Sequence, residues 1–266
     1  FGYPSNLISR FYGNPAFGCE VQKALVNYDK GNQIGLADQT REFKSSLGRT
    51  EGALAPSEFW YFWRRYFKFN DEQKLCDAEL ESVDANSLIR DLAAMEKSLG
   101  RPLVMKGMLL NWHIEYLAKI SPQFFFTHIQ RDLFYVAQSV LESRERYCGN
   151  REGWWSFKPP GYQDWLALSP IEQVAAQVVY TQKAVIEGMG KLPAERKINV
   201  EYSEFCMNPA AVYDDLAEKY RNLGCEIQVD RKEWPAFENR EEIRLSSSDE
   251  SALRRALEKF NVQVIA

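Results

Sequence analysis

The segment 101–147 constrains the fold most strongly, because two kinds of hydrophobic pattern alternate along it. "RPLVMKG" (101–107) and "QFFFTHI" (123–129) are short apolar runs of the kind that form buried strands. Each is followed by a segment with helical spacing of its apolar residues, over 108–120 and 133–147. A strand, a helix, a strand and a helix in this order predict βα units, whose strands lie parallel in one sheet. The sequence therefore predicts an α/β fold with a mainly parallel central sheet.

The rest of the chain is predicted to be rich in helices. Helical spacing, together with start and stop signals such as Ser57 and Gly100, predicts helices over 57–67, 84–100 and about 169–190, after Pro209, and over 246–260. A further strand is predicted within 196–205. No stretch resembles an interdomain linker, so a single domain over residues 1–266 is expected.

Composition excludes several classes of protein. The 266 residues are 45% hydrophobic and 26% charged, which is typical of globular proteins. A net charge of −4 argues against a nucleic-acid partner. The five cysteines form no CxxC pair, so neither a zinc site nor a disulfide framework is predicted and a cytoplasmic location is expected. No apolar run approaches the length of a membrane span, and no signal peptide is visible.

Arg131 lies two residues after the end of the predicted strand 123–129, and Ser139 lies eight residues after Arg131. Ligands of open parallel sheets bind outside the carboxyl ends of the strands. A guanidinium at such an end offers a planar set of donors for phosphate oxygens, and a serine in the next helix can add a hydroxyl. The alternative is that Arg131 pairs with a carboxylate such as Asp132 and that Ser139 packs between helices.

A strand, then Arg-Asp, then a serine eight residues after the arginine resembles the 3′-phosphate-binding segment of sulfotransferases that use 3′-phosphoadenosine 5′-phosphosulfate (PAPS). The resemblance continues in an ordered series. Residues 101–146 are similar to the family's strand, helix, strand and helix, and 154–181 to a loop and helix of its bacterial members. Residues 198–216 are similar to a later strand and helix, and 2–18 to the segment that follows the phosphate loop.

This resemblance implies a P-loop-like, three-layer α/β/α fold and transfer of a sulfuryl group from PAPS, with PAP (3′-phosphoadenosine 5′-phosphate) as the product. It implies that Arg131 and Ser139 hold the 3′-phosphate. The acceptor would be a hydroxyl of a glycan, a lipid or another small molecule, and sulfuryl transfer needs no metal.

The resemblance also implies a general base that takes the proton of the acceptor. Glu58, in "LAPSEFWYFW", is the candidate, because a carboxylate beside aromatic residues is partly desolvated. The alternative places Glu58 in the first turn of a helix, where its charge favours the helix dipole. Lys106, at the end of the predicted strand 101–107, is a second catalytic candidate, and its alternative is a solvated lysine. His113 and His128 are expected to be core residues.

The long loop 149–165 is rich in Trp, Pro and Gly, and loops of this length are more often functional than not. Trp155 and Lys158 are candidates for binding the substrate, since an aromatic ring and an ammonium suit an anionic or sugar-like ligand. The alternative is that they anchor the loop. "SRERY" (143–147) is expected to be a solvated helix face.

One part of the family pattern is missing from the sequence. No GxxxxGK[ST] motif or similar phosphate loop occurs, and "GNQIGLADQT" (31–40) lacks both a basic residue and a preceding strand. The protein is therefore expected to continue upstream of Phe1 by about 20–40 residues, a length that holds a first strand and the phosphate loop. The alternative is a non-catalytic member that binds nucleotide or serves in protein interactions. A phosphotransferase would need a Lys-Ser/Thr loop and an acidic magnesium ligand, which the sequence does not show.

Overall fold

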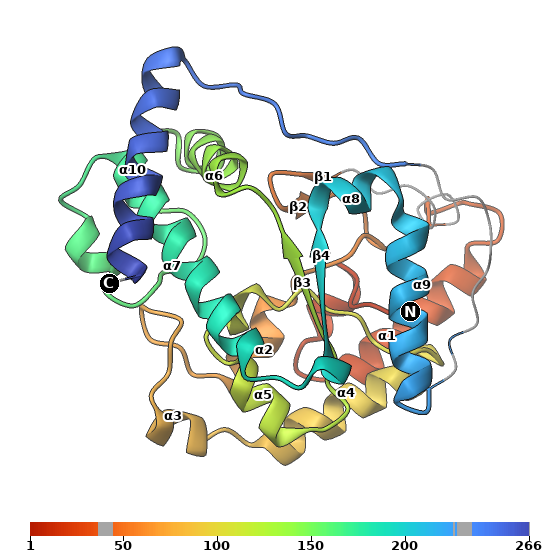
Figure 1. The fold of residues 1–266 in the computed structure, drawn as a ribbon. Coiled ribbons are helices and arrows are strands. Elements are labelled where there is room, and N and C mark those ends of the chain that lie inside the picture. The colour runs from red at the N-terminus through yellow and green to blue at the C-terminus, as the bar shows by residue number, and fades with distance from the viewer. Residues whose placement is uncertain (37–44, 226, 228–235, 266) are drawn as a thin grey trace. The chain divides into compact units, whose positions relative to one another are not determined.

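Figure 1 shows the computed structural model of the chain, which describes residues 1–36, 45–225, 227 and 236–265. Residues 37–40 of the glycine-containing segment 31–40 lie outside this description. The structure is 55% helical with a small parallel sheet, which agrees with the α/β class. Contacts divide it into two compact units, Phe1–Leu110 and Asn111–Ala266. The single-domain organisation stays a prediction.

The first unit is mostly helical. Its elements are a 3-10 helix (Ile8–Phe11), α1 (Pro15–Tyr28), the two-residue antiparallel strands β1 (Ser45–Ser46) and β2 (Arg49–Thr50), α2 (Trp60–Tyr66), α3 (Asp77–Glu81), α4 (Ala85–Leu99) and a 3-10 helix (Met108–Leu110). Helix α4 matches the predicted helix 84–100 because its local signals are strong. The Asp84 carboxylate accepts from the backbone N–H of Ser87, and Gly100 adopts a left-handed conformation at the other end. The buried side chains Leu88, Leu92 and Met95 form its inner face.

The strand predicted over 101–107 is wrong. In its place the described residues show a single parallel bridge between Gly2 and Leu103, with a hydrogen bond on either side of Gly2. A strand needs a partner along its length, and here the pairing stops after one residue. The helix predicted over 108–120 is shorter than expected, since it begins at Ile114 after a turn at 111–112.

The second unit contains a parallel pair formed by two of the segments in which the sequence predicted strands, 123–129 and 196–205. Strand β3 (Phe126–Gln130) lies beside β4 (Lys197–Glu201) in parallel, with Phe126 opposite Lys197 and Gln130 opposite Glu201. Its helices are α5 (Ile114–Ile120), α6 (Leu133–Cys148), α7 (Pro170–Gly190), α8 (Tyr202–Met207), α9 (Pro209–Asn222) and α10 (Ser247–Ile265). Helices α6, α7 and α9 begin within a residue of the predicted positions.

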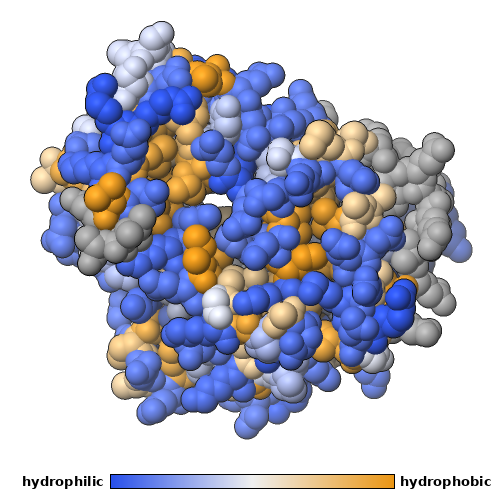
Figure 2. Space-filling model, viewed as in Figure 1, coloured by the Kyte–Doolittle hydropathy of each residue, from blue (hydrophilic) through white to orange (hydrophobic). Residues whose placement is uncertain are grey.

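Helices α6, α7 and α10 enclose the main core of this unit (Figure 1). Helix α7 begins with a capping box, in which Ser169 and Glu172 each bind a backbone N–H of the other. The buried core residues include Phe134, Leu141, Val174, Val178, Leu253 and Phe260. None of the helices within the described ranges is long and apolar enough to cross a bilayer. On the face seen in Figure 2, hydrophilic side chains predominate and hydrophobic ones lie scattered among them.

His128 lies in this sheet as a buried residue, as expected, and His113 is also buried. Desolvation lowers the pKa of His128 below its ordinary value of 6.5, although hydrogen bonds to the side chains of Gln182 and Asn199 oppose this effect. Below pH 6.5 the unfolded chain therefore binds a proton at His128 that the folded chain does not bind. The contribution of His128 to the free energy of unfolding is fully present above that pH and is lost as the pH falls below it.

We expect His128→Gln to weaken this pH dependence. The contribution of one histidine is at most about 1.4 kcal/mol per pH unit. Urea unfolding at pH 7.5, 6.5 and 5.5 measures the slope for both proteins. An unchanged slope in the variant would show that other groups cause the acid sensitivity.

Candidate functional site

The carboxyl ends of the two parallel strands bring two side chains together. Gln130 and Glu201 are opposite each other in the register, so the residues that follow them, Arg131 and Tyr202, leave the sheet at the same edge. The guanidinium carbon of Arg131 lies 4.5 Å from the centre of the Tyr202 ring and 5.9 Å from that of Tyr135. Two aromatic rings therefore orient a cation at the edge where open α/β sheets bind ligands.

The hydrogen bonds of Arg131 leave one of its donors unused. Nη2 donates to the backbone oxygen of Arg240 at 2.7 Å. Among the described residues Nε is buried without a hydrogen-bond partner, and Glu241 Oε1 lies 3.5 Å from it. Asp132, the partner considered from the sequence, instead caps α6 by accepting from the N–H of Phe134. A buried donor of this kind can bind an anion without giving up an existing hydrogen bond.

Ser139 lies on α6, as predicted, but its hydroxyl is already engaged. It donates to the backbone oxygen of Tyr135 at 2.9 Å, which is a common bond for a serine within a helix. The side chain is half-buried. Because the hydroxyl proton is used in this bond, the hydroxyl must rotate before it can donate to a phosphate. Ser139 and Arg131 do not hydrogen-bond to each other in the described part of the chain.

An extended segment, residues 237–244, passes over this edge, and we call it the strap. Figure 1 shows it in blue, leading into α10. The N–H of Phe237 donates to Cys206 of α8, while Gln138 of α6 bonds to Glu242 and Arg244 of the strap. The strap was not predictable from the sequence, because its charged composition resembles that of an ordinary solvated segment.

The two catalytic candidates, Glu58 and Lys106, lie side by side in the first unit. Lys106 Nζ is 2.7 Å from Glu58 Oε1, and the indole Nε1 of Trp60 donates to Glu58 Oε2 at 2.5 Å. Helix α2 begins only at Trp60, so Glu58 precedes the helix and does not lie in its first turn. Lys106 is half-exposed, and Glu58 is more enclosed, with 23% of its side chain accessible.

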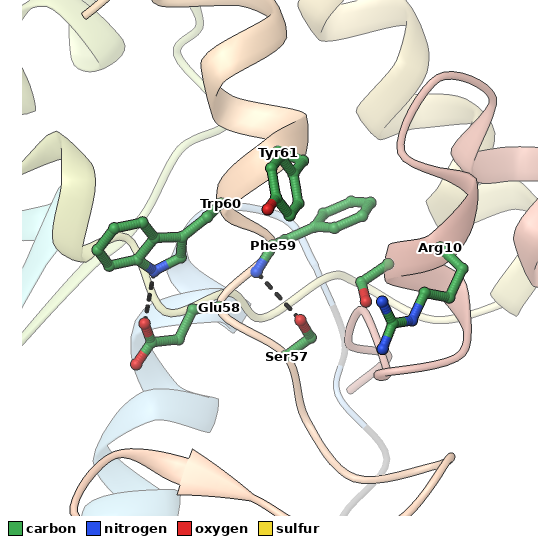
Figure 3. A pocket seen from close by; sticks show the side chains of 7 residues that line it. Arg10, Ser57, Glu58, Phe59, Trp60 and Tyr61 are labelled. Carbon is green, nitrogen blue, oxygen red and sulfur yellow. Dashed lines mark hydrogen bonds between the residues drawn. The ribbon is translucent and has the colours of Figure 1, made fainter. Parts of the chain in front are cut away.

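A strained turn brings Glu58 and Trp60 together. Phe59, between them, adopts φ +56° and ψ +37°, a left-handed conformation that bulky residues rarely take. Figure 3 shows the result, the Glu58 carboxylate facing the Trp60 indole, with a dashed hydrogen bond between them. Both side chains line a shallow hollow of about 190 Å³. Its lining residues are Ser9, Arg10, Ser57, Glu58, Phe59, Trp60 and Tyr61. The hollow therefore combines a carboxylate, a guanidinium and aromatic rings.

The candidates on the long loop contact their own neighbours. Trp155 stacks on Tyr147 with ring centres 4.4 Å apart. Lys158 Nζ lies 3.1 Å from the hydroxyl of Tyr162 and over its ring. Gln177 of α7 donates to the backbone oxygens of Trp155 and Phe157, which fixes the loop. These contacts match the anchoring alternative, and a role in binding substrate stays a prediction.

In the ranges that the structure describes, no group of three His, Cys, Asp or Glu side chains is placed to hold a metal ion. No protein-family model, no curated protein and no solved structure matches the chain.

Proposed function

We propose that this chain is a PAPS-dependent sulfotransferase with a P-loop-like, three-layer arrangement around its parallel strands. The proposal rests on the ordered resemblance over 2–18, 101–146, 154–181 and 198–216. The structural observation that carries it is the guanidinium of Arg131, which lies at the shared carboxyl edge of β3 and β4 with its Nε lacking a hydrogen-bond partner. The acceptor is a hydroxyl of a glycan, a lipid or another small metabolite.

A phosphate monoester fits the free donor of Arg131. It carries between one and two negative charges at neutral pH and three acceptor oxygens, so it supplies both the charge and the acceptor that Nε lacks. Tyr202 and Tyr135 hold the guanidinium in a defined plane, which reduces the entropy lost on binding. In the proposed complex Arg131 binds the 3′-phosphate of the nucleotide, and Ser139 adds a hydroxyl donor after rotation.

The donor nucleotide, when bound, supplies an activated sulfuryl group. In the proposed step Glu58 takes the proton from the acceptor hydroxyl as the new sulfur–oxygen bond forms. The bond between sulfur and the bridging phosphate oxygen of PAPS breaks, and PAP leaves with that oxygen. Each of its carboxylate oxygens already accepts one hydrogen bond, from Lys106 or Trp60, and each retains a further lone pair for the acceptor. The ammonium of Lys106 pairs with one carboxylate oxygen and orients the group, and the Trp60 indole holds the other oxygen in place.

Calorimetry with PAP and with 5′-AMP tests the proposal, because the two nucleotides differ only in the 3′-phosphate. We expect PAP to bind at least about 100-fold more tightly, which corresponds to about 2.7 kcal/mol. Equal affinities, or no binding of either nucleotide, would contradict the proposal. Binding of PAP without transfer of labelled sulfate from PAPS to any hydroxyl acceptor would favour the alternative of a non-catalytic nucleotide-binding protein.

A further inference from the structure

The contacts of the strap point to a regulatory role for one of its side chains. We infer that Glu241 is an internal competitor that occupies the phosphate position at Arg131 and lowers the affinity of the site for nucleotide. This inference rests on the proposed function, since it concerns the same site.

The pairing of Glu241 with Arg131 is close but incomplete. Both side chains are largely enclosed, each with 19% of its surface accessible, so the two charges lie where water screens them poorly. Yet the carboxylate oxygen stays 3.5 Å from Nε, and Nε has no hydrogen-bond partner. Glu241 thus neutralises the guanidinium without satisfying its donor. A phosphate oxygen that approaches to hydrogen-bond distance satisfies both needs and can replace the carboxylate.

The strap backbone keeps Glu241 at this position. On one side of Glu241, the backbone oxygen of Arg240 accepts from Arg131 Nη2. On the other side, the backbone oxygen of Glu242 and the N–H of Arg244 both bond to the side chain of Gln138, at 2.9 and 2.8 Å. Arg244 also forms two hydrogen bonds with Glu142. Because the strap is attached on both sides, the carboxylate has a high effective concentration at the guanidinium.

The other acidic residues of the strap have different surroundings. Glu238 pairs with Arg240 of the strap itself, and both side chains are mostly exposed. The side chain of Glu242 is exposed, although its backbone contacts Gln138. Glu241 is therefore the strap acid whose carboxylate faces the guanidinium of Arg131. Glu242 provides a matched control, because its replacement removes the same charge one residue away.

Internal competition raises the apparent Kd, which equals the intrinsic Kd divided by the fraction of molecules in which the site is open. We expect Glu241→Gln to bind PAP about tenfold more tightly than the wild-type chain, because the neutral amide no longer competes. Glu241→Asp, which keeps the charge on a shorter side chain, should give a smaller gain. Glu242→Gln should leave the Kd for PAP within about twofold of wild type, since solvent and salt largely screen the exposed carboxylate of Glu242.

Calorimetry with PAP on these variants, each checked for its fold by circular dichroism, separates the possible failures. If Glu241→Gln binds PAP no more tightly than wild type while wild type prefers PAP over 5′-AMP, the competitor is disproved and the proposed function stands. If neither the wild type nor Glu241→Gln binds PAP, both are disproved. If Glu242→Gln gains as much as Glu241→Gln, the effect is one of net charge and the specific contact is disproved.

Discussion

Arg131→Ala is expected to lower the affinity for PAP by at least about 100-fold and to abolish the preference for PAP over 5′-AMP. Removing one partner of an enclosed, charge-assisted contact costs about 2–5 kcal/mol, because the phosphate left behind has lost its counter-charge. The affinity for 5′-AMP should change little, since that nucleotide has no 3′-phosphate. Calorimetry with both nucleotides on the same preparation measures the two effects together.

Two further variants make this experiment specific. Arg131→Lys keeps the positive charge but loses the planar donors that the two tyrosines orient, so we expect it to recover only part of the affinity. Arg255→Ala removes an exposed arginine of α10 in the same unit and should bind as wild type does. If Arg131→Ala retains the full affinity for PAP, Arg131 is an anchor for the strap through Arg240 and Glu241, and the phosphate site is elsewhere.

Of the variants proposed here, Arg196→Ala is expected to lower the free energy of unfolding the most, by about 2–4 kcal/mol. Arg196 precedes β4, and its guanidinium donates to the backbone oxygens of Ala118, Ser121 and Phe124 at 2.6 to 3.1 Å. These oxygens belong to the end of α5 and to the turn that leads into β3. The side chain of Arg196 therefore connects the start of β4 with the end of α5 and the turn before β3. In the alanine variant all three backbone oxygens lose this donor.

Denaturant unfolding followed by circular dichroism measures this loss. Arg196→Lys supplies one ammonium in place of the planar guanidinium and should recover less than half of the difference. Lys191→Ala is the control, because it removes an ion pair with Glu115 that is exposed on both sides. Such pairs contribute little, so we expect no measurable change. A loss no larger in Arg196→Ala than in Lys191→Ala would show that water replaces the guanidinium without cost.

Much of the secondary structure was predictable because its signals are local. Asp84 and Gly100 limit α4, the sequence from Ser169 to Glu172 starts α7, and Pro209 starts α9. Each of these residues acts on the backbone within one helical turn, so the local sequence is sufficient to predict the helix end. The parallel orientation of β3 and β4 agrees with the mainly parallel sheet that the alternation predicted, whereas their pairing with each other was not predicted.

The candidate site was predictable only in part. Arg131 at the end of β3 followed from the strand itself, whereas its contact with Glu241 joins residues 110 positions apart, and no local pattern indicates it. The pairing of Glu58 with Lys106 spans 48 positions in the same way. Arg144 was expected on a solvated face, yet it is fully buried, with its guanidinium over Trp154 and a hydrogen bond to Gln173.

The sequence by itself thus determined the positions of β3, β4 and the longer helices of the second unit, the place of Arg131 at a strand end and the α/β class, but not the short helix α8. Only the tertiary structure decided that 101–107 forms one bridge, that Glu58 lies against Lys106, and that the strap crosses Arg131. The physical reason is the sequence separation over which each interaction acts. Caps, turns and periodicity act between residues a few positions apart, whereas ion pairs and strand partners depend on which distant segments the packed chain brings together.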